Sequence, residues 1–209
     1  MLKIVLPFVL AWAAMAQVPM ATPIRTGDFA RQLTKQDVDA VKALLPAGST
    51  PWLLNGDAGL GSNIYYIEAY LAPTSESGAV RSGTIVRAMR EINPPSKWKV
   101  QRPNQTYAQV AVRGRSFDQI QGDQDINRPF VVSGRFDDAE LITIVEFLRS
   151  NPALDASNSV QSFPILTLAR QSSSIVKVRT RGGPTKGQSI TMRLDGQKWI
   201  LVSVASWTA

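Results

Sequence analysis

Residues 189–207 read SITMRLDGQKWILVSVASW, and this stretch decides the fold of the C-terminal part of the chain. Asp195-Gly196 is typical of a tight hairpin turn, because the central residues of such turns adopt positive φ angles. The flanking segments, 189–194 and 198–207, are rich in β-branched, apolar and aromatic residues that favour strands. The stretch therefore predicts an antiparallel hairpin that ends in a long strand bearing tryptophan.

A helix and two more strands are predicted upstream of this hairpin. Asp137 and Glu140 form a capping pattern, an apolar surface follows, and Asn151-Pro152 ends the helix. Segments 165–170 and 175–181 have the composition of strands.

The N-terminal half shows the same order of elements. Thr34 and Asp37 have the spacing of a capping box, and an apolar stripe then runs as far as Pro46, which predicts a short amphipathic helix. Strands are expected after it, and the segments concerned are 64–71, 83–92, 98–100 and 106–113.

The fold class predicted from this order is α+β, with two units that each begin with a helix and continue as an antiparallel meander. The first unit would span 28–133 and the second 134–209, each packing its helix on a curved sheet. Segments 82–90 (SGTIVRAMR) and 173–181 (SSIVKVRTR) resemble each other, which leaves open whether the units are a duplication or one continuous domain.

The first 16 residues have the features of a signal peptide. A lysine at position 3 precedes an apolar run from Ile4 to Ala14, and the small residues Ala14 and Ala16 lie just before the expected cleavage point, which follows Ala16. Residues 17–27 contain prolines and a glycine and are expected to form a flexible leader. The sequence thus predicts a periplasmic or secreted protein with no transmembrane segment after signal removal.

The amino-acid composition limits which catalytic groups and metal ligands the chain can offer. The chain has no histidine and no cysteine, which removes the commonest general base and the commonest ligands of transition metals. We therefore expect no catalytic residues, no cofactor and no metal, and the composition favours a binding protein over an enzyme. Its net charge of +7 favours anionic partners, and export makes nucleic acid an unexpected one.

The C-terminal third resembles the cystatin-like and nuclear-transport-factor-like group of α+β proteins. Segments 195–202 (DGQKWILV) and 204–207 (VASW) carry the resemblance, which covers about a quarter of the chain. It implies a helix packed across a curved sheet that ends in a long strand. No catalytic residue of the group's enzymes is carried over, and segment 109–114 (QVAVRG) departs from the inhibitory hairpin motif of cystatins by one position.

A basic sheet face is the first candidate site. Alternation along strand 175–181 would place every second residue on one side, where neighbouring strands add further basic residues. The expected anion-binding face consists of Arg170, Lys177, Arg179, Arg181 and Arg193. A solvated sheet surface without a ligand explains the same pattern.

Two aromatic sites are also candidates. Tyr66, Glu68 and Tyr70 share one side of a predicted strand and could form a glycan-binding face, although strand tyrosines also fill cores. A cavity between helix and curved sheet could be lined by Phe147, Trp199 and Trp207.

An acidic segment around Asp118, Asp123 and Asp125 offers oxygen atoms at alternating positions. A calcium loop of the helix-loop-helix type needs glycine at its sixth position and glutamate at its twelfth, where Arg128 and Gly134 stand. A polar turn is the simpler interpretation.

Two functions remain after these arguments. The first is a non-catalytic envelope protein that binds an anionic polymer, a membrane surface or a partner protein. The second is a small-molecule-binding or isomerase-like protein with a cavity between its helix and its curved sheet.

Overall fold

The computed structural model describes residues 22–58, 63–112, 114–154, 163–182 and 186–208. The expected signal peptide, residues 1–16, lies outside these ranges, as do residues 17–21 of the expected leader. In the described part of the chain, no helix combines the length and the hydrophobicity needed to cross a bilayer.

Of the three helices in the described ranges, two are those that the sequence predicts. Helix α2 (Lys35–Lys42) begins after Thr34, which forms a capping box with Asp37. Helix α3 (Asp138–Ser150) begins after Asp137, whose carboxylate accepts a hydrogen bond from the Glu140 amide at 2.7 Å. These side chains satisfy amide groups that have no partner within the first helical turn. Helix α1 (Asp28–Gln32) was not expected.

The strands form one sheet with eleven members. In chain order they are β1 (Ile24–Thr26), β2 (Pro51–Ala58), β3 (Ile64–Leu71), β4 (Ser75–Ser77), β5 (Val80–Glu91), β6 (Lys99–Val110), β7 (Phe130–Ser133), β8 (Ile165–Arg170), β9 (Ile175–Thr180), β10 (Lys186–Asp195) and β11 (Lys198–Thr208). Their spatial order is β1-β2-β3-β5-β6-β7-β8-β9-β10-β11, and β4 pairs with β5. Pairing is antiparallel except for β1 with β2 and β7 with β8. The chain is thus an α+β protein dominated by antiparallel sheet.

The C-terminal hairpin is confirmed. Asp195 of β10 pairs with Lys198 of β11, and Gly196 in the turn has a φ of 62°. Strand β3 has the bounds of the predicted segment 64–71.

The prediction of two helix-then-meander units is wrong. Strand β7 forms three residue pairs with β6 and three with β8, and Val131 and Val132 take part in both sets, so the two halves share a continuous mixed sheet. The segment that forms β7 is not among the predicted strands. In the structure it satisfies the backbone groups of both neighbouring strands, which is the reason two separate sheets do not form.

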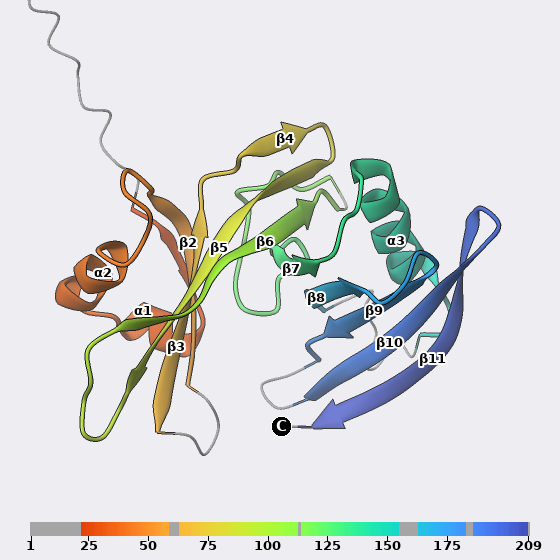
Figure 1. The fold of residues 1–209 in the computed structure, drawn as a ribbon. Coiled ribbons are helices and arrows are strands. Elements are labelled where there is room, and N and C mark those ends of the chain that lie inside the picture. The colour runs from red at the N-terminus through yellow and green to blue at the C-terminus, as the bar shows by residue number, and fades with distance from the viewer. Residues whose placement is uncertain (1–21, 59–62, 113, 155–162, 183–185, 209) are drawn as a thin grey trace, which may run out of the picture.

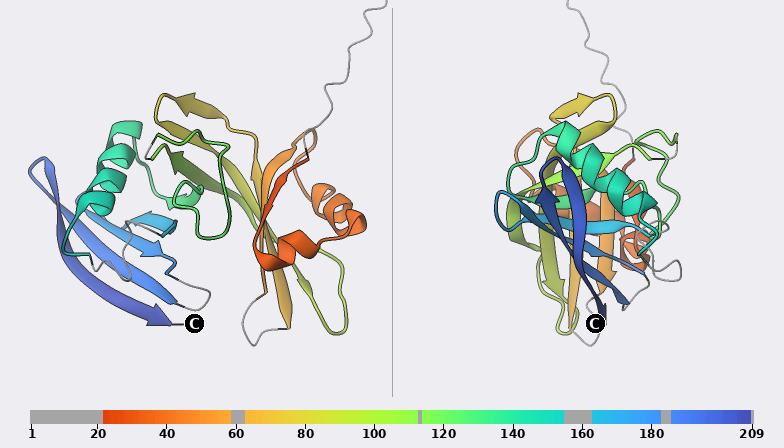
Figure 2. Two further views of the ribbon diagram at one scale, coloured as in Figure 1. Left: turned by 180° about the vertical axis from the view of Figure 1, so that it is seen from behind. Right: turned by 90° about the vertical axis from the view of Figure 1, so that its right-hand side faces the viewer.

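The sheet bends at β7 into two arms, as Figure 1 and the views of Figure 2 show. We call β1 to β6 the N-terminal arm and β8 to β11 the C-terminal arm. Helices α1 and α2 lie against the N-terminal arm, and α3 lies against the C-terminal arm (Figure 1). Strand β1 falls within the expected leader, so that part of the leader is paired into the sheet.

Three apolar clusters fill the molecule. The first packs α3 on the C-terminal arm and includes Ile144, Leu148 and Leu168, which have no exposed surface. The second packs α1 and α2 on the N-terminal arm. The third lies within the N-terminal arm, on β2, β3, β5 and β6, and consists of Leu53, Tyr70, Ile85 and Tyr107. Strand β5 contributes to all three clusters, which makes it the common element of the core.

Candidate functional site

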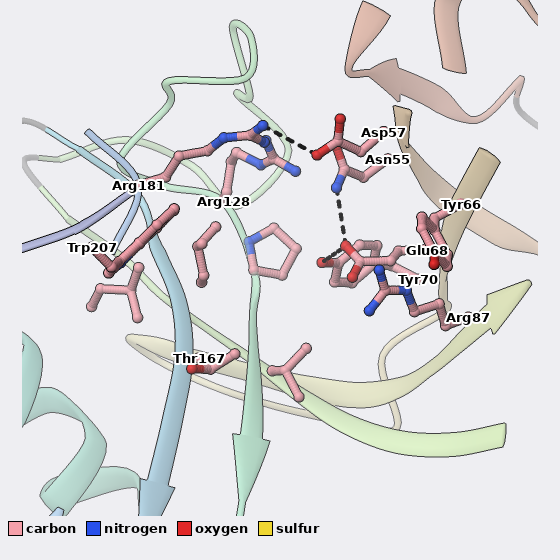
Figure 3. Close-up of a pocket in the computed structure, with 14 residues that line it drawn as sticks. Asn55, Asp57, Tyr66, Glu68, Tyr70, Arg87, Arg128, Thr167, Arg181 and Trp207 are labelled. Atoms are coloured by element: carbon pink, nitrogen blue, oxygen red, sulfur yellow. Dashed lines mark hydrogen bonds and ion pairs between the residues drawn. The ribbon is translucent and has the colours of Figure 1, made fainter. Parts of the chain in front are cut away.

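A cleft of about 280 Å³ lies between the two arms of the sheet. One wall comes from β2, β3 and β5 of the N-terminal arm, on the side facing away from α1 and α2. The other wall comes from the C-terminal arm and the segment that leads into β7. The lining residues are Asn55, Asp57, Tyr66, Glu68, Tyr70, Arg87, Arg128, Pro129, Val131, Ile165, Leu166, Thr167, Arg181 and Trp207. Figure 3 shows their arrangement.

The N-terminal wall contains the predicted aromatic face. Tyr66, Glu68 and Tyr70 alternate along β3 with buried residues of the opposite side, so all three turn toward the cleft. The Glu68 carboxylate accepts hydrogen bonds from the Asn55 amide at 3.0 Å and from the Tyr70 hydroxyl at 3.3 Å (Figure 3). The carboxylate is therefore held in one orientation by two donors.

Burial raises the pKa of Tyr70 well above its ordinary value of 10.0, and the negative charge of Glu68 raises it further. The folded protein thus keeps this phenol neutral at pH values where the unfolded chain has begun to ionise. The neutral Tyr70 phenol makes its full contribution to the free energy of unfolding below about pH 10. This contribution is lost as the pH rises toward the pKa of Tyr70 in the folded protein.

We expect the free energy of unfolding to fall above about pH 10, and Tyr70→Phe to make that fall shallower by up to about 1.4 kcal/mol per pH unit. Urea denaturation of both proteins at a series of alkaline pH values measures the two slopes. Parallel slopes would show that the Tyr70 hydroxyl does not control the alkaline limit.

Three arginines surround the cleft and come from different elements. The Arg87 guanidinium lies 4.3 Å from the centre of the Tyr66 ring, and its buried Nε has no hydrogen-bond partner within the described ranges. Arg128 is 6% exposed and donates a hydrogen bond to the Asp123 carbonyl at 3.0 Å. A buried guanidinium atom without an acceptor is costly, so an anionic ligand would compensate it.

The third arginine reaches across the cleft. Arg181 follows β9 in the C-terminal arm, and its Nη2 lies 3.2 Å from Oδ2 of Asp57 in β2 (Figure 3). The pair therefore links the two walls. The Asp57 side chain is 56% exposed, so water screens the pair and its contribution to stability is small.

Trp207 forms part of the C-terminal wall because of a β-bulge. The pairing of β10 with β11 shifts by one residue between Thr191 and Met192, which leaves Val202 as the additional residue in β11. A bulge reverses the alternation of the residues that follow it. Trp207 consequently lies on the side of the sheet opposite Trp199, where it covers Gly187 and stands 4.9 Å from the Arg179 guanidinium.

The structure brings together four of the five predicted basic residues. Lys177, Arg179 and Arg193 are exposed on the face of the C-terminal arm that carries Trp207, and Arg181 continues this face into the cleft. Arg170 pairs with Val176 and so lies on the other face, where its guanidinium is 2.5 Å from Glu140 of α3.

The predicted cavity residues do not share a cavity in the described part of the chain. Trp199 is 5% exposed within the cluster beneath α3, and Phe147 packs against that cluster from the helix. Trp207 lies on the opposite side of the sheet and lines the cleft instead.

The acidic segment is engaged by donors from the protein. Asp125 accepts hydrogen bonds from Arg115 at 2.7 Å and from the amides of Gln121 and Asn127, and Asp123 accepts one from the Gly27 amide. Among the described residues, no group of three or more acidic side chains is arranged to hold a metal ion. The segment is thus a polar turn held by its own hydrogen bonds. The Asp123 carbonyl in this turn accepts a hydrogen bond from Arg128, which lines the cleft.

Asn55, Asp57, Arg87, Arg128 and Thr167 line the cleft but were not predicted. Alternation along β5 could have identified Arg87, since its strand was recognised in the sequence. No local sequence pattern identifies Arg128, because its segment reaches the bend only through the tertiary structure.

The chemistry that this arrangement offers is recognition of charge and shape. Guanidinium groups bind carboxylates and phosphates, while tyrosine and tryptophan rings present flat surfaces suited to sugar rings and apolar groups.

Comparison with known proteins adds little to this description. No protein-family model matches the chain, and no curated protein sequence matches it significantly. Among solved structures it has a weak similarity to one described as "Ntf2 like protein involved in plasmid conjugation", with 10% sequence identity, coverage of 72% of this chain and 77% of that chain, and a TM-score of 0.19. The match names the group that the C-terminal third resembles, but at this TM-score it carries no argument about fold or function.

Proposed function

We propose that this chain is an exported, non-catalytic protein that binds an anionic polymer in the cleft between the arms of its sheet. One observation carries the proposal: Arg87, Arg128 and Arg181 all line the cleft, and the buried Nε of Arg87 has no hydrogen-bond acceptor among the residues that the structure describes. The opening sequence supports export.

The size of the cleft suits one unit of a polymer. Its volume of about 280 Å³ is at the lower limit of ligand-binding pockets, which supports a single sugar-sized group rather than a large cofactor. Tyr66 and Trp207 supply aromatic surfaces on opposite walls for such a group (Figure 3).

The basic face supplies a path for the rest of the polymer. Lys177, Arg179 and Arg181 follow one another at every second position of the chain, so their Cα atoms are spaced by about 7 Å where the backbone is extended. Repeated carboxylates or phosphates along a polymer would meet this row one after another. Binding of this kind depends strongly on ionic strength.

The test uses the mature chain and polygalacturonate, a carboxylate polymer, with dextran as the neutral polymer. The double variant Arg179→Gln/Arg181→Gln should bind polygalacturonate about tenfold more weakly at low salt, because two charge-assisted contacts are removed. Affinity chromatography or calorimetry at about 0.05 M and about 0.5 M NaCl measures the change and its screening.

A charge-matched control shows whether the loss of affinity comes from a specific binding site or only from the lower net charge. Lys35→Gln/Lys42→Gln removes the same charge from α2, which covers the opposite face of the N-terminal arm. This control should retain the affinity of the wild-type protein. Equal losses in the two variants, or equal binding to dextran, would refute the proposal.

A further inference from the structure

Glu68 and Arg87 lie directly opposite each other on neighbouring strands, yet they form no ion pair. They are partners in the register of β3 with β5, and both side chains line the cleft. Opposite charges placed in this way on one face of an antiparallel pair attract each other. Within the described ranges, however, neither side chain forms an ion pair with any residue. The two charges therefore face the cleft unpaired.

Uncharged neighbours hold the two side chains apart. The Arg87 guanidinium lies over the Tyr66 ring, 4.3 Å from its centre, and this contact leaves the N–H groups of the guanidinium free to donate. Glu68 instead accepts hydrogen bonds from Asn55 at 3.0 Å and from Tyr70 at 3.3 Å (Figure 3). Both side chains are thus fixed in orientations that do not neutralise each other.

One oxygen of Glu68 remains available to a ligand. Both hydrogen bonds from the protein go to Oε2, whereas Oε1 accepts none from the described residues and is not buried. An ionised carboxylate can only accept hydrogen bonds. A ligand atom that meets Oε1 must therefore carry a hydrogen, as a hydroxyl group does, and a carboxylate or phosphate oxygen would be repelled.

Arg87 needs the opposite kind of partner. Its guanidinium forms no hydrogen bond within the described part of the chain, so it requires an acceptor from a ligand. A hydroxyl group satisfies both sides at once, because its hydrogen is donated to Glu68 while its oxygen accepts from Arg87. Hydrogen bonds linked in this way strengthen one another.

Arg128 supplies a cation for an acid group in the same cleft. It is 6% exposed, and its hydrogen bond goes to the neutral carbonyl of Asp123. Burial is the main reason that the pKa of Tyr70 is raised; the charge of Glu68 raises this pKa as well, whereas the charges of Arg128 and Arg87 lower it. All three charges thus lie near one phenol, in a cleft of about 280 Å³ that suits one sugar unit.

We propose that the polymer bound in the cleft is a chain of acidic sugars, in which one hydroxyl bridges Glu68 and Arg87 while a carboxylate is bound by Arg128. This inference rests on the proposed function and narrows its ligand from anionic polymers in general to uronates. An anionic polymer without hydroxyl groups would meet Arg128 but would bring no donor to Glu68, whose charge would repel it.

Glu68→Gln separates the two classes of polymer. Binding of polygalacturonate to the mature chain should become about fivefold weaker, because the hydroxyl then donates to a neutral amide instead of a carboxylate. Binding of polyacrylate, which carries carboxylates but no hydroxyls, should stay the same or become tighter, because a negative charge is removed. Calorimetry at about 0.15 M NaCl measures both affinities, and circular dichroism confirms the fold.

Glu146→Gln is the matched control, since it makes the same substitution on the exposed side of α3. It should change neither affinity by more than about twofold, because salt screens a charge so far from the cleft. If Glu68→Gln changed the binding of both polymers in the same direction, the inference would be overturned while the proposed function would stand. A wild-type chain that bound neither polymer would refute both.

A modified polymer tests the bridging hydroxyl without a variant. O-acetylation of polygalacturonate removes hydroxyl hydrogens and keeps the carboxylates, so the wild-type protein should bind the acetylated polymer at least about fivefold more weakly. Glu68→Gln should lose less affinity on acetylation, because it lacks the charged acceptor from the start. Equal affinities of the wild-type protein for the two forms of the polymer would contradict the bridging hydroxyl.

Discussion

Replacing Gly187 with alanine should destabilise the protein by about 3 kcal/mol, the upper part of the usual cost of overpacking. A Cβ atom at this position would lie 2.0 Å from the Thr180 carbonyl oxygen and 2.4 Å from Cζ2 of Trp207. The carbonyl belongs to the backbone of β9, so no side-chain rotation relieves the contact. The strands must separate, or Trp207 must leave the position in which its indole donates to the Gln188 carbonyl.

Urea denaturation followed by circular dichroism measures this cost. Gly122→Ala is a suitable control, because a Cβ atom there meets only a side-chain nitrogen of Arg31 at 3.9 Å and the residue needs no positive φ. The control should stay within about 0.5 kcal/mol of the wild-type protein. Similar stabilities for the two variants would show that β9, β10 and Trp207 are packed less closely than described.

Leu148→Ala should cost about 2–5 kcal/mol, because it leaves a cavity at a position with no exposed surface beneath α3. Leu148 belongs to the cluster that joins α3 to the C-terminal arm, and strands β5 and β6 contribute to the same cluster. We therefore expect the loss to lower the stability of the whole sheet in a single transition. Fluorescence and circular dichroism should give the same midpoint.

Glu146→Ala on the exposed side of the same helix provides the comparison. It should change stability by no more than about 0.5 kcal/mol. Two separate transitions in Leu148→Ala, one for each arm, would contradict the view that shared strands couple the clusters.

The elements that could be predicted are those with local signals. The capping box of Thr34 and Asp37, the cap at Asp137 and the turn at Gly196 are interactions between residues close in sequence. Short elements without such signals were missed, among them β1, β7 and α1. The pairing of β7 with two neighbours depends on segments far away in the chain, and missing it led to the incorrect division into two units.

The candidate site shows the same limit. Alternation correctly grouped Tyr66, Glu68 and Tyr70, because period-two patterns follow from the backbone of a strand. Trp207 was expected to line one cavity with Trp199, but the bulge at Val202, which cannot be read from composition, puts the two tryptophans on opposite sides of the sheet. Arg170 was expected to extend the basic face from a neighbouring strand, but the register of β8 with β9 places it on the side of the sheet that faces α3.

The narrow connection at β7 has a mechanical consequence. Three residue pairs on each side join the arms there, while the walls of the cleft belong to opposite arms. Flexing at this strand and widening of the cleft are thus one motion, which the weak pair of Asp57 and Arg181 resists only slightly. A ligand that contacts both walls would hold the arms at one angle, and its binding free energy would include the cost of fixing that angle.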